Sequence, residues 1–190
     1  MNTQLTWRLA QPADVAAINA LTARSIRALH DGSYSDAVID EAVRHAYGVD
    51  WQLVRDGTYF VAEIDGALAG AGGWSYRQTI AGAHGPDSPP APLLDPARDA
   101  ARVRAFYVDP DHVRNGVGRL LLRLSEGAAR AAGFTQAELT STLPAVPFYA
   151  AFGYAPVRRF DMPMPSGATL HLELMTKALL PDEPTSHGRP

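Results

Sequence analysis

Two glycines at the start of an amphipathic stretch are the residues whose type and spacing most suggest chemistry. Gly116 and Gly118 follow an apolar, strand-like segment that ends at Val108, and they precede apolar residues at helical spacing. The first backbone N–H groups of a helix have no partner within the helix, and the helix dipole adds about half a positive charge there. Because glycine lacks a Cβ, a phosphate can approach such a backbone closely. The segment therefore predicts an anion site, to which Arg114 and Arg119 add positive charge.

A Gly-x-Gly pair by itself has two other interpretations. Glycines near a helix start often serve only a turn, and another kind of nucleotide-phosphate binder could use the same pair. The sequence, however, has no third glycine at the spacing of a dinucleotide-binding motif and no Gly-Lys-Ser/Thr of a P-loop. A nucleotide-phosphate binder is therefore the weaker of the functional alternatives.

The segment resembles the acetyl-CoA motif of the GNAT superfamily of N-acetyltransferases. That motif is a strand ending in Val-x-Pro, followed by Arg/Gln-x-x-Gly-x-Gly/Ala and an amphipathic helix. Val108 and Pro110 match the strand end, and Gly116 and Gly118 match the two glycines. The family's Arg/Gln position falls on Val113, and the basic residue is displaced to the next position.

A second motif lies downstream at a suitable spacing. Residues 147–154, Pro-Phe-Tyr-Ala-Ala-Phe-Gly-Tyr, look like the family's Phe-Tyr-x-x-x-Gly-Phe segment. The family often carries an asparagine seven residues before the tyrosine, where this chain has Thr142. Together the two motifs cover residues 102–154, and two ordered motifs are far more specific than either alone.

The resemblance implies an enzyme that transfers an acetyl group from acetyl-CoA to a primary amine of a small molecule or protein by direct attack. Tyr149 takes the family's position for the acid that protonates the departing thiolate. A tyrosine pKa of about 10 and a thiol pKa of about 8.5 suit this transfer. Without the motif, Tyr149 would be interpreted as a packed helix tyrosine. The residues expected to contact acetyl-CoA are Phe106, Tyr107, Val108, Val113, Arg114, Asn115, Gly116, Val117, Gly118, Arg119, Thr142 and Tyr149.

The sequence does not fix the group that removes the proton from the amine. Glu63, His84, Asp87 and Asp109 are candidates by location only. The alternative function is a non-catalytic acyl-CoA-binding or sensor module of the same fold. An open acceptor cleft beside Tyr149 would favour catalysis over this alternative.

Composition excludes several other classes of function. The net charge of −3 gives no basic excess for nucleic-acid binding, and no stretch approaches the roughly 20 apolar residues of a membrane span. The chain has no cysteine, and its six histidines show no metal-ligand spacing, so we expect no metal. Residues 1–10 do not resemble a secretory signal, and we expect a cytoplasmic protein. Many members of the resembling family form dimers, which makes a homodimer the oligomer to expect.

Hydrophobic periodicity predicts helices interleaved with strands, which indicates a mixed α/β domain. The expected helices begin at residue 12, at residue 35, near residue 51, at residue 117 and near residue 144. The expected strands cover residues 6–9, 58–64, 68–76, 103–108, 136–141, 157–162 and 168–175. The family resemblance adds a central, mostly antiparallel sheet with a splayed strand pair, flanked by helices.

Residues 1–180 are expected to form one domain with a proline- and glycine-rich loop inserted at residues 78–100. We interpret this loop as a lid or a substrate-side element, and residues 181–190 as a loose tail. Glycines at 70, 72 and 73 predict a bulge or a close backbone approach within the strand before the loop. Arg104 interrupts an apolar strand, and therefore needs either a charged partner or a place at an edge.

Overall fold

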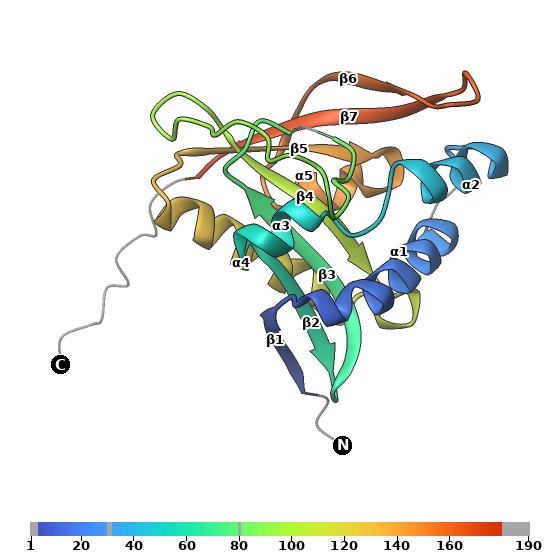
Figure 1. The fold of residues 1–190 in the computed structure, drawn as a ribbon, viewed down its shortest axis with the longest axis horizontal. Helices are drawn as coiled ribbons and strands as arrows, with labels where there is room; N and C mark the ends of the chain where they lie inside the picture. The colour runs from blue at the N-terminus through green and yellow to red at the C-terminus, as the bar shows by residue number, and fades with distance from the viewer. Residues whose placement is uncertain (1–3, 30–31, 80, 180–190) are drawn as a thin grey trace.

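The computed structural model describes residues 4–29, 32–79 and 81–179, which form a seven-stranded sheet with helices on both sides (Figure 1). The strand order is β1-β2-β3-β4-β5-β7-β6, and every neighbouring pair is antiparallel except β4 and β5. The strands are β1 (Leu5–Leu9), β2 (Tyr59–Ile64), β3 (Ala67–Ser75), β4 (Ala101–Val108), β5 (Gln136–Thr142), β6 (Ala155–Pro163) and β7 (Thr169–Ala178). The helices are α1 (Val15–Leu29), α2 (Asp36–His45), α3 (Trp51–Asp56), α4 (Val117–Ala131) and α5 (Val146–Ala151), with short 3-10 turns η1 (Pro12–Asp14), η2 (Pro110–His112) and η3 (Leu143–Ala145).

The parallel pair β4 and β5 separates soon after it forms. The two strands pair only at Ala101–Ala137 and Arg102–Glu138, where the two charged side chains also form an ion pair. Beyond these positions β4 pairs with β3 alone, so the C-terminal halves of β4 and β5 leave room between them. The expected mixed α/β fold, with a mostly antiparallel sheet and one splayed strand pair, is thus confirmed.

Glycines in β3 allow its neighbours to approach closely, as the sequence suggests. A Cβ on Gly70 would lie 2.5 Å from Cγ1 of Val117. A larger residue at position 70 would therefore push α4 away from the sheet. Near Gly72 the pairing between β3 and β4 shifts, and Ala105 opposite takes a left-handed φ of 54°. This bulge changes which face of the sheet the following residues of β4 occupy.

Two apolar clusters hold the helices to opposite faces of the sheet. The amphipathic helix α4 buries Val117, Leu121 and Leu122 against one face, together with residues of α5. On the other face, Ile18 of α1 and Leu53 of α3 pack with the inward side chains of β2 and β3. A third cluster joins α2 to the β6–β7 hairpin, which extends towards α2 (Figure 1).

The expected loop at residues 78–100 contains neither a helix nor a strand in its described part, apart from one bridge between Arg77 and Leu93. Several hydrogen bonds tie it to the domain: Arg55 donates to the carbonyls of Pro86 and Ser88, and the amide of Trp51 donates to the carbonyl of His84. The tail expected at residues 181–190 lies outside the described residues. None of the helices in the described part of the chain combines the length and the apolar character needed to cross a membrane.

Candidate active site

A cavity of about 560 Å³ opens where β4 and β5 separate. Its walls come from the end of β4, the glycine segment at the start of α4, the end of β5, and helices α1, α2 and α5. We call this space the main cavity. Its lining residues are Ser25, Ile26, Tyr34, Ile39, Tyr47, Phe106, Val108, His112, Val113, Arg114, Gly116, Val117, Gly118, Arg119, Thr142, Pro144, Ala145, Phe148, Tyr149 and Phe152.

The glycine segment presents backbone amides to this cavity. Arg114 and Gly116 take left-handed φ values of 66° and 83°, and helix α4 begins directly afterwards at Val117. Within the described residues, the amides of Gly116, Val117 and Gly118 have no hydrogen-bond acceptor. The segment is therefore a helix N-terminus with free donors at the wall of the cavity, which is the arrangement that favours an anion.

Close packing shapes the cavity beside these amides. A Cβ on Gly118 would lie 3.1 Å from the ring of Phe148, and a Cβ on Gly72 would lie 2.9 Å from the ring of Phe106. The two aromatic rings can occupy these places because the facing residues are glycines. Phe106 and Phe148 in turn contact Tyr149 edge-on, with ring centroids 6.4 and 5.0 Å away.

Tyr149 lies in α5 with only 8% of its surface exposed, and that remaining surface lines the main cavity. Burial raises the pKa of its hydroxyl well above the usual value, and the proximity of Tyr107 adds to this. The hydroxyl is thus a neutral proton donor across the physiological range.

Of the twelve residues expected to contact acetyl-CoA, ten line the main cavity and two do not. Asn115 lies outside the lining, and Tyr107 lines a second, small cavity of about 70 Å³. Strand alternation places Tyr107 on the face opposite Phe106 and Val108, and the bulge at Ala105 brings Arg104 onto the same side as Tyr107. Thr142 stands at the end of β5 and does line the main cavity.

The wall supplied by α1, α2 and the residues that flank α2 was not predicted from the sequence. We call Ile26, Tyr34, Ile39 and Tyr47 the acceptor wall; all four line the main cavity. Tyr34 is fixed by its hydroxyl, which donates to the carbonyl of His171 at 2.6 Å and accepts from the amide of Leu143 at 2.9 Å. Ile26 and Ile39 follow ordinary amphipathic spacing, and Tyr34 and Tyr47 flank α2, so the sequence holds no signal that distinguishes the four from core residues.

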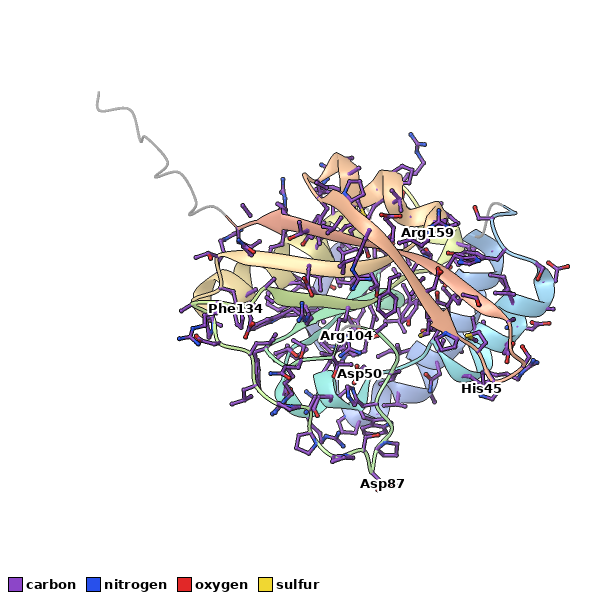
Figure 2. The ribbon with its side chains drawn as sticks, turned by 90° about the horizontal axis from the view of Figure 1, so that it is seen from above. His45, Asp50, Asp87, Arg104, Phe134 and Arg159 are labelled. Atoms are coloured by element: carbon purple, nitrogen blue, oxygen red, sulfur yellow. The ribbon has the colours of Figure 1, made fainter. Side chains whose placement is uncertain are left out.

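A buried charge cluster adjoins the second cavity. Arg104, whose side chain is 5% exposed, pairs with Asp50 at 2.7 Å, and the other oxygen of Asp50 lies 3.0 Å from Nδ1 of His84. Figure 2 shows Asp50 next to Arg104. Burial lowers the pKa of the Arg104 guanidinium, and the charge of Asp50 opposes this effect. Since Arg104 also donates to the carbonyl of Gly82, the cluster anchors the loop that carries His84.

None of the four base candidates lines the main cavity. Glu63 binds Arg8 at the outer strands, and His84 belongs to the buried cluster. Asp87 is exposed at the tip of its loop, far from Arg104 (Figure 2). Asp109 caps η2 and pairs with Arg24 at 3.1 Å. The part of the chain that the structure describes contains no group of three or more side chains able to hold a metal ion.

Solved structures with the same fold are numerous. A GCN5-related N-acetyltransferase from Rhodopseudomonas palustris is 22% identical, with 94% of this chain and 98% of that chain covered and a TM-score of 0.68. The PaiA N-acetyltransferase of Thermoplasma acidophilum in complex with coenzyme A is 14% identical, with 92% and 99% covered and a TM-score of 0.63. The structure of yncA from Salmonella typhimurium with acetyl-CoA is 21% identical, with 96% of both chains covered and a TM-score of 0.59. At these identities the likeness establishes the fold.

The sequence itself provides the evidence of family. No curated protein matches it. The model of the acetyltransferase (GNAT) family matches residues 23–154, which include both motifs and every lining residue of the main cavity. This match extends over more than half of the chain, and the splayed strands and the free amides before α4 agree with it. The protein therefore belongs to the GNAT acetyltransferase family.

Proposed function

We propose that this protein transfers an acetyl group from acetyl-CoA to a primary amine by direct attack of the amine. One observation carries the proposal: a single cavity joins the free amides at the start of α4 to the buried hydroxyl of Tyr149. Acetyl-CoA has a diphosphate at one end and a thioester at the other. The diphosphate requires an anion site, and the thioester requires a proton donor for its leaving sulfur, and one cavity offers both.

The residues that line the main cavity fit the parts of acetyl-CoA. The amides of Gly116 to Gly118 are free donors for diphosphate oxygens, and Arg114 and Arg119 add positive charge beside them. The backbone of residues 106–108 borders the gap between β4 and β5, where an extended pantetheine arm has strand-like partners. Coenzyme A and acetyl-CoA are present in the PaiA and yncA structures, respectively, which supports the same co-substrate here.

In the proposed reaction, the amine nitrogen forms a bond with the thioester carbonyl carbon and the carbon–sulfur bond breaks. Tyr149 gives its hydroxyl proton to the departing sulfur, and the nitrogen loses a proton as the amide forms. None of the four carboxylate and histidine candidates lines the main cavity, and His112, which does, belongs to the turn before the glycine segment; we therefore propose that water takes the proton from the nitrogen. The open cavity beside Tyr149 favours catalysis over a sensor role.

The test is acetyl-CoA-dependent thiol release over a panel of primary amines, with Tyr149→Phe compared with the wild type. We expect the substitution to lower kcat by about 10²-fold or more, with acetyl-CoA affinity nearly unchanged. Tyr154→Phe is the matched control, because Tyr154 is also a buried tyrosine and contacts Tyr149, but it does not line the cavity. An unchanged rate in Tyr149→Phe would refute the acid role. A cytoplasmic location and a homodimer stay predictions.

A further inference from the structure

The acceptor wall consists of aliphatic and aromatic side chains, whose polar side-chain atoms are the hydroxyls of Tyr34 and Tyr47. Ile26 and Ile39 contribute aliphatic side chains, and Tyr34 and Tyr47 contribute aromatic rings. The hydroxyl of Tyr34 is occupied by backbone groups of β7 and η3, so this residue offers mainly its ring to a ligand. The charged residues and the histidine that line the cavity, Arg114, Arg119 and His112, belong to the glycine segment and the turn before it. The cavity thus has one cationic part and one apolar part.

No aspartate or glutamate lines the main cavity in the described residues. The buried carboxylates on the surrounding elements already have partners that hold them elsewhere. Glu41 accepts from the amide and hydroxyl of Ser166, Asp50 pairs with Arg104, and Asp109 pairs with Arg24. A positively charged ligand group that enters the apolar part would therefore lose its hydration without gaining a carboxylate.

We propose that the acyl acceptor is a monoamine with an apolar body, and that the acceptor wall excludes amines that carry a second positive charge. This inference rests on the proposed acetyl transfer and names its substrate class. The apolar body packs on Ile26, Ile39 and the two tyrosine rings, while the single amine reaches the thioester. Polyamines and other polycationic amines are excluded, because their further ammonium groups find no carboxylate among the described residues that line this cavity.

Hexylamine and 1,6-diaminohexane form a matched pair for the test, because they have the same length and differ by one ammonium group. We expect kcat/KM for hexylamine to exceed that for the diamine by about 100-fold, since burying an unpaired charge costs several kcal/mol. Equal values, or a preference for the diamine, would overturn the inference and leave the acetyl transfer standing.

Calorimetry provides a readout that does not depend on turnover. Each amine is titrated into the protein saturated with coenzyme A, and tighter binding of hexylamine supports the inference even if no acetyl transfer occurs. In that case the proposed reaction fails and the assignment of the acceptor wall stands. Equal binding of the two amines, or binding of neither, overturns the assignment.

A designed carboxylate tests the wall itself. Ile39 lies in the first turns of α2, where a negative charge suits the helix dipole, and it lines the cavity. We expect Ile39→Asp to raise the relative kcat/KM for the diamine by about tenfold or more, and the uncharged control Ile39→Asn to leave the ratio unchanged. A ratio that is the same in both variants overturns the inference. Should either variant unfold, the wild-type ratio and the calorimetry still decide it.

Discussion

Removing the charge of Asp50 should destabilise this protein far more than removing a comparable charge at its surface. Asp50 is 1% exposed, and its carboxylate lies 2.7 Å from the guanidinium of Arg104, which is itself 5% exposed. In Asp50→Asn the arginine would remain buried without a counter-charge. Such a loss costs about 3–5 kcal/mol, out of a total stability of about 5–15 kcal/mol.

The substitution removes the charge that faces Arg104 and His84 but keeps the helix cap. Asp50 also caps α3 by accepting from the amide of Gln52 at 2.9 Å, and asparagine caps helices as well as aspartate does. The size of the side chain is nearly unchanged as well. For a chain of 190 residues, the expected loss corresponds to a fall in Tm of about 10 °C.

Urea unfolding followed by circular dichroism measures the loss directly. The control is Asp40→Asn, because Asp40 pairs with Arg27 at 3.1 Å while both side chains are 51% exposed. Exposed pairs contribute at most about 1 kcal/mol. In Arg104→Met/Asp50→Asn both charges are gone, so the double variant should lose less than Asp50→Asn alone. The reasoning is refuted if Asp50→Asn loses no more than Asp40→Asn.

Three further predictions concern the main cavity. Gly116→Asp should weaken coenzyme A binding more than tenfold by calorimetry. The control Gly66→Asp changes a glycine with nearly the same positive φ that does not line the cavity, and it should bind normally. Equal affinities for the two variants would contradict the anion site. Gly72→Ala should raise the KM for acetyl-CoA several-fold, because the Cβ of the alanine would displace the ring of Phe106. An unchanged KM would show that this ring does not shape the site. Burial raises the pKa of Tyr149 and favours its neutral form. In an absorbance titration, the difference between wild type and Tyr149→Phe should therefore show no phenolate from this residue below about pH 10.

Much of the fold could be predicted from local patterns. Apolar spacing predicted the helices that begin near residues 12, 35, 51, 117 and 144, and the structure has α-helices or 3-10 turns at each of these places. The seven expected strands are also present, because alternation and turn residues report local backbone preferences directly. The family was predicted from two short motifs, since the positive φ of Gly116 and the close packing of Gly118 allow few other residues.

Only the tertiary structure decided which residues meet. The partner of Arg104 is Asp50, which lies 54 positions earlier in the chain, and no local pattern connects them. The single-residue bulge at Ala105 places Arg104 on the same side of the sheet as Tyr107, which strand alternation alone does not reveal. The acceptor wall could not be predicted from the sequence for the same reason. Its apolar residues on α1 and α2 look like core residues, and only the separation of β4 and β5 leaves a space beside them. A sequence specifies local conformation residue by residue, whereas a cavity exists only where distant elements fail to close on one another.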